Sequence, residues 1–142
     1  MGKLISIGEA LIDFVPLQKG VPLSEVSQFK RVAGGAPANV CACVSRLGGE
    51  SVLLTQLGMD GFGDHIINEL QKVNVNVNHI TRTSKANTGL AFVSLKEDGN
   101  REFSFYRNPS ADLFNISKFI ILLVIIIKFK NIGIIVIINK CK

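Results

Sequence analysis

The stretch "GGAPANVCACVSRLGG", residues 34–49, places two glycines, a proline and one asparagine directly before a run of small apolar residues. Pro37 suits the first turn of a helix, because its φ is already helical and its missing N–H would have no partner there. Paired glycines after such a run are a typical helix stop. The sequence therefore predicts a helix that begins near Pro37 and ends at Gly48–Gly49.

The residues at the mouth of this helix are suited to binding a polar ligand. Gly34 and Gly35 carry no Cβ, so a ligand can approach the backbone closely and positive φ is allowed. Asn39, about one turn into the helix, offers two donors and one acceptor, a set that suits hydroxyl groups. The stretch lacks both the Gly-Lys-Ser/Thr of a P-loop and the G-x-G-x-x-G of a dinucleotide fold. From spacing alone, a hydroxyl-binding site and a plain strand–turn–helix junction both stay open.

The rest of the first 114 residues alternates between apolar runs and turn signals. Two short apolar runs and one extended segment predict strands, and a later segment predicts a β-hairpin with its turn at Asp98–Gly99. These segments are "KLISIG" (3–8), "ALIDFVPL" (10–17), "SVLLTQLG" (51–58) and "TGLAFVSLKEDGNREFSFYRN" (88–108). With the helices between them, this order predicts an α/β domain with an antiparallel accessory piece.

The stretch "GMDGFGD" (58–64) resembles a calcium loop at first, because Asp60 and Asp64 are both acidic. An EF-hand needs oxygen ligands at alternate positions and a Glu at the twelfth. Phe62 stands at the third position and Gln71 at the twelfth, so a structural turn and no metal site is the prediction. A helix with one apolar face follows; that face comprises Phe62, Ile66, Ile67, Leu70 and Val73.

The charge of this chain is unevenly distributed. Residues 1–114 hold eleven Lys or Arg and eleven Asp or Glu, whereas residues 115–142 hold five Lys and no acidic residue. A neutral body gives no electrostatic footprint for nucleic acid, so no nucleic-acid partner is expected. The odd count of three cysteines without framework spacing indicates a reducing compartment, and we expect a cytoplasmic protein. Cys41 and Cys43 are expected to pack as small apolar residues.

The composition changes at residue 115. Residues 115–142 contain eleven Ile among 28 residues, and their apolar runs are interrupted by Lys128 and Lys130. The favoured interpretation is translated intron or frameshifted sequence, because Ile, Lys, Asn and Phe have A/U-rich codons. A hydrophobic strand tail is the second interpretation. A membrane anchor is the weakest, since a span needs about 20 largely apolar residues. We therefore predict a boundary at residue 114.

The stretch "FYRNPSAD" (105–112) places Tyr106 and Arg107 at the end of the predicted hairpin. An aromatic ring beside a guanidinium can cover a small polar ligand and bind its oxygens. An ordinary strand end would carry the same residues, so both interpretations stay open at this point.

Taken together, five stretches resemble the pfkB/ribokinase-like carbohydrate kinases, and within them the plant-type fructokinases, in order and in spacing. They are "ISIGEALIDFVP", "VAGGAPANV", "QLGMDGFGDHI", "ANTGLAFVSL" and "FYRNPSAD". The resemblance covers residues 3–114. It implies an α/β sandwich with a small β-lid from residues near 11–31 and 88–107. It also implies the phosphorylation of fructose to fructose 6-phosphate by Mg-ATP.

The resemblance implies roles for six substrate-binding residues. Asp13 would hold sugar hydroxyls, the two glycines would line the floor under the sugar, and Asn39 would bond a hydroxyl. Arg107 would contact the sugar from the end of the lid, with Tyr106 as a weaker candidate beside it. The full set is Asp13, Gly34, Gly35, Asn39, Tyr106 and Arg107.

The family's second signature, a D-T-x-G-A-G-D type segment that carries the catalytic base and the anion hole, has no counterpart after residue 114. We therefore assign no catalytic and no cofactor-binding residue here. The chain is expected to be truncated and to lack appreciable kinase activity alone. Conversion of fructose with ATP at a normal enzymatic rate would contradict this expectation.

Two alternatives stay open. One is a relative that acts on another sugar or on a nucleoside, which a substrate panel would distinguish. The other is a non-catalytic remnant that binds sugar or pairs with an intact kinase through the lid. Co-purification with a full-length subunit would support pairing, whereas a strictly monomeric product would count against it.

Overall fold

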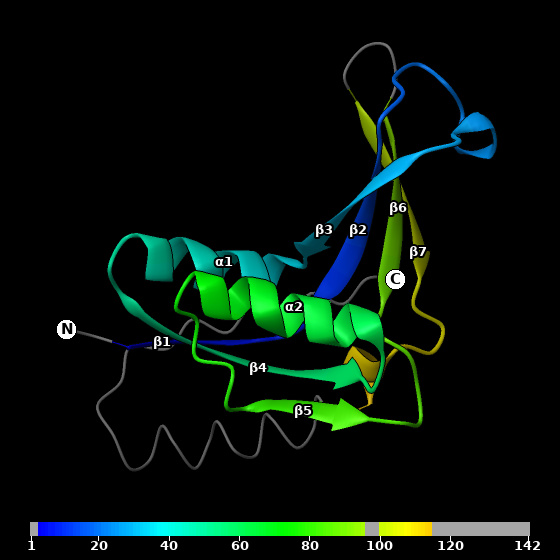
Figure 1. Cartoon of the computed structure of the whole chain (residues 1–142). Helices are drawn as coiled ribbons and strands as arrows, with labels where there is room; N and C mark the ends of the chain where they lie inside the picture. The colour runs from blue at the N-terminus through cyan, green and yellow to red at the C-terminus, as the bar shows by residue number, and fades with distance from the viewer. Residues whose placement is uncertain (1–2, 96–99, 115–142) are drawn as a thin grey trace.

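The computed structural model describes residues 3–95 and 100–114, which form two sheets and two α-helices (Figure 1). The predicted turn at Asp98–Gly99 and the tail of residues 115–142 lie outside the described residues. The elements are β1 (Lys3–Ile7), β2 (Leu11–Pro16), η1 (Leu23–Glu25), β3 (Phe29–Gly34), α1 (Ala36–Arg46), β4 (Glu50–Gly58), α2 (Gly61–Lys72), β5 (Ile80–Thr83), β6 (Leu90–Leu95), β7 (Arg101–Tyr106) and η2 (Ala111–Leu113). The predicted α/β fold class is confirmed.

A parallel three-stranded sheet in the order β1-β4-β5 forms the base of the structure. Ile5 lies opposite Val52 between β1 and β4, and Thr55 lies opposite Ile80 between β4 and β5. Nearly every side chain of β1 and β4 is buried, which is why both strands are continuous apolar runs in the sequence. The short β5 was not predicted, because its four residues are mostly polar and half-buried.

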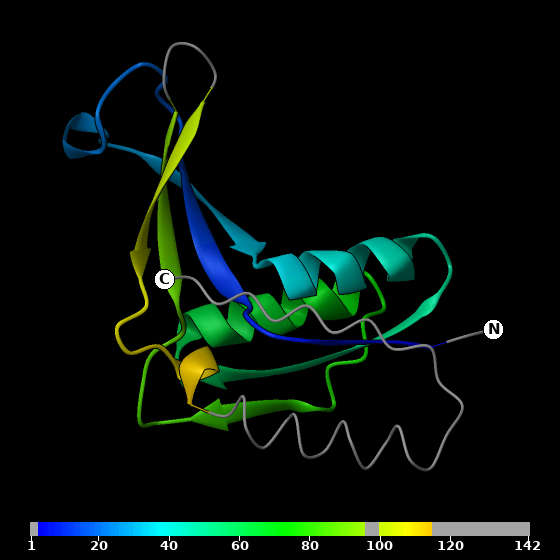
Figure 2. The same cartoon turned by 180° about the vertical axis from the view of Figure 1, so that it is seen from behind.

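Both α-helices lie on the same face of this base sheet (Figures 1 and 2). Their apolar sides meet the sheet in one core cluster of fully or nearly buried residues. Its members are Leu4, Ala10, Ile12, Ala38, Cys41, Leu53, Leu57, Ile66, Leu70 and Val75. The predicted apolar face of α2 is confirmed, since Ile66 and Leu70 are buried and Phe62, Ile67 and Val73 pack against the cluster. Each buried Leu or Ile contributes about 1.5–3 kcal/mol to folding.

The predicted boundaries of α1 are confirmed within two residues. The helix begins at Ala36, directly before Pro37, and ends at Arg46, followed by Gly48 with φ at 83°. The two cysteines differ in their surroundings. Cys41 is buried, with its Sγ 3.5 Å from the Val52 carbonyl, as predicted. Cys43 is exposed, so the packing role predicted for it is wrong; two residues on a helix turn by about 200° and face opposite sides.

A second sheet of four strands in the order β3-β2-β6-β7, the lid sheet, rises from one end of the base sheet (Figure 2). The pairs β2–β3 and β6–β7 are antiparallel, and the parallel pair β2–β6 joins the two hairpins. Strand β3 was not predicted, because Lys30 and Arg31 are exposed and interrupt its apolar pattern. Among the described residues, no helix is long and apolar enough to cross a membrane.

Candidate functional site

Asp13 and Gly34 meet where the lid sheet joins α1. Leu11 of β2 pairs with Gly34 of β3, and this register sets the Asp13 side chain over the Gly34 backbone. A Cβ at position 34 would overlap the Asp13 carboxylate, so glycine is what allows the carboxylate to lie there. Asp13 is half-buried, and this burial raises the pKa of its carboxyl above the ordinary value. The partly desolvated carboxylate is a strong acceptor for a ligand hydroxyl.

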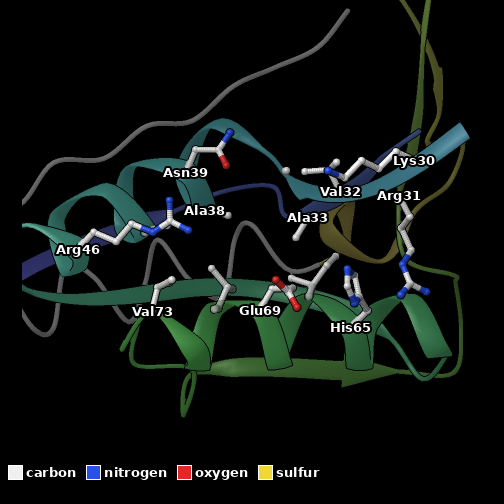
Figure 3. Close-up of a pocket in the computed structure, with 14 residues that line it drawn as sticks. Lys30, Arg31, Val32, Ala33, Ala38, Asn39, Arg46, His65, Glu69 and Val73 are labelled. Atoms are coloured by element: carbon white, nitrogen blue, oxygen red, sulfur yellow. The ribbon is translucent and has the colours of Figure 1, made fainter. Parts of the chain in front are cut away.

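Gly35 and Asn39 continue the same surface into α1. Gly35 turns the chain from β3 into the helix with φ at 102°, a conformation that residues with a Cβ rarely adopt. The backbone N–H of Asn39 donates to the backbone carbonyl of Gly35 at 2.9 Å, and the Asn39 side chain is exposed. Figure 3 shows the Asn39 amide directed away from the α2 side chains. The structure thus gathers Asp13, Gly34 and Gly35 at one point, with Asn39 one turn further along α1.

A groove of about 450 Å³ lies between β3, α1 and α2 (Figure 3). Gly34 and Asn39 line it, but Asp13 does not. Arg31 pairs with Phe14 in the lid sheet, so its side chain leaves the face opposite to that of Asp13 and points toward His65 on α2 (Figure 3). Residues from both faces of β3 line the groove, and the Asp13 carboxylate is not among them.

Four residues, one from each lid strand, form a row on the face that carries Asp13. Val32 pairs with Asp13, Asp13 pairs with Ala91, and Ala91 pairs with Phe105. Paired residues of neighbouring strands point to the same face, so Phe105 shares the face of Asp13. Phe105 is 47% exposed, and its ring is stacked on that of Phe103. Sequence reasoning did not select Phe105, because only the pairing register connects it to Asp13.

Tyr106 lies on the opposite face of the lid sheet. It pairs with Leu90, which in turn pairs with Ile12, and its ring packs edge-on against Phe92 at 5.2 Å. The structure therefore does not bring the Tyr106 ring to the face that carries Asp13.

Arg107 is held in a buried ion pair where β7 returns to the base sheet. Its guanidinium bonds the Asp112 carboxylate, which also accepts a hydrogen bond of 2.5 Å from the Ser110 hydroxyl. Arg107 and Asp112 are only 8% and 6% exposed, and the Arg107 Nε has no partner among the described residues. Arg107 also lines a second groove, of about 350 Å³, together with Phe105 and Tyr106. The contact of Arg107 with sugar stays a prediction.

Candidate metal-ligating side chains are not clustered in the described residues. No group of three or more His, Cys, Asp or Glu side chains comes together in residues 3–95 and 100–114. The two carboxylates of "GMDGFGD" already have partners: Asp60 bonds Thr88 and Gly63, and Asp64 bonds Arg82.

Comparison with known proteins identifies the family of this chain. The pfkB family carbohydrate kinase profile matches residues 1–128. This chain belongs to the pfkB family of carbohydrate kinases. The family match continues past residue 114, where the sequence predicts a boundary, and that boundary stays a prediction.

Individual pfkB relatives cover the same region. The chain is 53% identical over 112 residues to probable fructokinase-2 of Arabidopsis thaliana, covering 79% of this chain and 34% of the relative. It therefore spans about a third of the length of that curated relative. A crystal structure of fructokinase with bound ATP from Xylella fastidiosa is 46% identical, with a TM-score of 0.67 over 79% of this chain and 32% of that one.

A second solved structure with ATP is also similar. It is an uncharacterized sugar kinase from Pyrococcus horikoshii, 32% identical, with a TM-score of 0.79 over 94% of this chain and 52% of that one. Members of the family therefore include ATP-binding sugar kinases, and both the fold and the family predicted from the sequence are confirmed.

Proposed function

We propose that this chain carries the sugar-binding part of a fructokinase, with fructose as the ligand. The observation that carries this proposal is the Asp13 carboxylate seated over Gly34, at the junction of the lid sheet and α1. Identity of about 50% to plant fructokinases over this region favours fructose over other sugars.

The arrangement suits a small polyol. Asp13 accepts hydrogen bonds from sugar hydroxyls, and Asn39 both donates and accepts. Gly34 and Gly35 let the sugar lie directly on the backbone, while Phe105 on the same face of the lid sheet offers an apolar surface for its carbon atoms. Small-molecule sites typically combine such apolar walls with a few polar groups that fix the orientation.

The reaction of the whole enzyme, on this proposal, is transfer of a phosphoryl group from Mg-ATP to a fructose hydroxyl, in the cytoplasm. Phosphoryl transfer depends on positioning and on stabilisation of charge at the γ-phosphate. The described residues do not assemble the groups for that stabilisation, so the role proposed for them is to bind and orient the sugar.

Pairing through the lid is the second candidate role. All six residues of β7 are exposed, and Phe103 and Phe105 expose nearly half of their side chains. An exposed apolar edge strand readily accepts a partner strand. This observation favours pairing with another lid, alongside sugar binding.

The Gly34→Ala substitution tests the sugar site. The three heavy atoms nearest to a Cβ at position 34 all belong to Asp13, so the methyl group would displace the carboxylate and little else. We expect fructose affinity to fall roughly tenfold or more, since a hydrogen bond to a charged group is worth about 1.5–3 kcal/mol. Isothermal titration calorimetry with fructose measures this change.

The matched control for this substitution is Gly61→Ala on α2, because a Cβ there meets no atom within 4 Å. It should bind fructose like the unmodified chain, and both variants should keep its circular dichroism spectrum. Equal affinity of Gly34→Ala and the unmodified chain would contradict the proposed site, as would the absence of fructose binding by the unmodified chain.

Fructose binding should weaken in acid through Asp13. Burial places the pKa of Asp13 above its ordinary value of 3.8, so the free site gains a proton as the pH falls through this raised pKa. The protonated carboxyl loses acceptor capacity, and the affinity should fall by up to about tenfold per pH unit below that pKa. Because the pKa of Asp13 is higher in the folded chain than in the unfolded chain, the ionised carboxylate lowers the free energy of unfolding at pH values above the folded-state pKa. This loss of stability disappears as the pH falls and the carboxylate gains its proton.

Calorimetric titration across the acidic range measures this dependence, and Asp13→Asn supplies its control. The amide cannot titrate, so the affinity of this variant should be weak at every pH. A pH profile of the unmodified chain that matches that of Asp13→Asn would assign the dependence to another group.

A further inference from the structure

The Asp60 carboxylate at the start of α2 forms hydrogen bonds to the residue that begins the lid sheet. Asp60, the residue before α2, accepts hydrogen bonds from three donors at 2.8 Å each. Its Oδ1 receives the Gly63 N–H and the Thr88 hydroxyl, and its Oδ2 receives the Thr88 N–H. An N-cap carboxylate normally satisfies helix N–H groups alone. Here two of the three bonds go to Thr88, which is 28 residues further along the chain.

Thr88 stands where the chain enters the lid sheet. It is 3% exposed and precedes Gly89, whose carbonyl accepts the N–H of Ile12 in β2 at 3.0 Å. The Thr88 hydroxyl also accepts the N–H of Gly58 at 3.1 Å. Asp60 is therefore connected to Ile12, the neighbour of Asp13, by its hydrogen bonds to Thr88, the peptide bond from Thr88 to Gly89, and the hydrogen bond between Gly89 and Ile12.

The glycines of "GMDGFGD" (58–64) allow the backbone around Thr88 to lie close to the turn that precedes α2. A Cβ at Gly58 would lie 2.6 Å from the Thr88 nitrogen, and one at Gly63 would lie 2.6 Å from the Gly58 carbonyl oxygen. Both distances are too short for real contacts and involve backbone atoms, which cannot rotate away. Arg82 closes the turn from the outside, with its Nε donating to the Gly58 carbonyl at 2.9 Å.

An aromatic contact supports the same junction. The Phe62 ring, in the first turn of α2, packs edge-on against the Phe14 ring of β2, with centroids 5.7 Å apart. Phe14 also stacks on Phe92 of β6 at 4.9 Å, so the contact reaches both central lid strands. Polar and apolar contacts thus bind the lid sheet to one helix turn.

We propose that Asp60 is a positioning residue for the sugar lid. By holding Thr88 at the start of α2, it fixes strands β6 and β2, and with them Asp13 over Gly34 and Phe105 on the same face of the lid sheet. This inference rests on the proposed sugar site for its functional meaning, whereas the anchoring of the lid is a property of the chain that is measured without sugar.

The tests are two substitutions in the full 142-residue chain. Asp60→Asn keeps a good N-cap, since Asn and Asp are equivalent there. Its amide, however, cannot accept from Gly63, the Thr88 hydroxyl and the Thr88 N–H together. Thr88→Val keeps the shape of the side chain and removes the hydroxyl. The controls are Thr88→Ser, which retains a hydroxyl at position 88, and Asp64→Asn, which removes a negative charge from the same turn of α2.

Hydrogen exchange of backbone amides separates a lid anchor from a simple helix cap. We expect roughly tenfold faster exchange in β2 and β6 for Asp60→Asn and Thr88→Val, with unchanged exchange in β1 and in residues 50–57 of β4. The Gly58 N–H is left out of this comparison, because it loses its acceptor in Thr88→Val. Fructose affinity should fall severalfold in the same two variants. Thr88→Ser and Asp64→Asn should exchange and bind like the unmodified chain.

Three results would contradict the proposed role of Asp60 as an anchor of the lid sheet. They are faster amide exchange across the lid sheet, α2 and the base sheet alike, faster exchange confined to α2, and unchanged exchange. If Asp60→Asn does not fold, Thr88→Val decides by the same criteria. If the unmodified chain binds no fructose but the lid exchanges selectively, the proposed function fails and the anchor stands. If fructose binds and both variants match the unmodified chain, the anchor alone fails.

Discussion

Replacing Arg107 by leucine is expected to lower the free energy of unfolding by about 3–5 kcal/mol. Arg107 and Asp112 are both more than nine-tenths buried, and the substitution leaves the Asp112 carboxylate without its cation. Ser110 supplies the one remaining hydrogen bond to that carboxylate among the described residues. A loss of this size is a large fraction of the 5–15 kcal/mol that stabilises a typical domain. Urea unfolding followed by circular dichroism measures it.

Two controls show whether the loss of stability comes from leaving a buried charge unpaired or from removing any ion pair. The double variant Arg107→Leu with Asp112→Leu should recover much of the loss, because an apolar pair of similar volume often replaces a buried ion pair without cost. Lys72→Ala removes one partner of an exposed pair with Glu69 and should change the stability little.

The Arg107→Leu variant also distinguishes the ion pair of Arg107 from a direct contact of Arg107 with fructose. A stable Arg107→Leu chain that no longer binds fructose would contradict the structural role and support a direct contact with the sugar. A destabilised chain whose folded fraction binds fructose normally would assign Arg107 to the ion pair alone. Comparing the unfolding midpoint with the fructose affinity distinguishes these outcomes.

The Gly35→Ala substitution should lower the free energy of unfolding by about 2–5 kcal/mol. A φ of 102° is strained for any residue with a Cβ, at about 1–2 kcal/mol. The added Cβ would also lie 2.5 Å from the Glu9 carbonyl oxygen and 3.0 Å from the Ala10 Cα. These are backbone atoms of a buried segment, and such overpacking adds about 1–3 kcal/mol. The loss appears as a lower urea midpoint.

Gly48→Ala is the matched control for Gly35→Ala. Gly48 also has positive φ, at 83°, but a Cβ there meets no atom within 4 Å. It should therefore lose only the conformational part, about 1 kcal/mol. Equal losses in the two variants would show that the contact with Glu9 and Ala10 does not contribute.

The elements that the sequence predicted share a local cause. Continuous apolar runs predicted β1 and β4, and a period of 3.6 residues predicted the buried face of α2. Proline and glycine predicted both ends of α1. Strands β3 and β5 were not predicted because their residues are half-buried or charged. They are strands because β3 pairs with β2 and β5 pairs with β4, and their own sequences do not show a strand pattern.

The sequence by itself determined the family, the fold class and the presence of glycines and Asn39 at a strand–helix junction, because motif order and local periodicity are properties of the chain alone. Only the tertiary structure decided that Phe105 shares the face of Asp13 while Tyr106 lies behind it, that Arg107 is buried against Asp112, and that Asp60 bonds Thr88. Each of these depends on strand register or on contacts between distant segments. A shift of one residue in register would exchange the two faces of a strand, and no local pattern specifies that register.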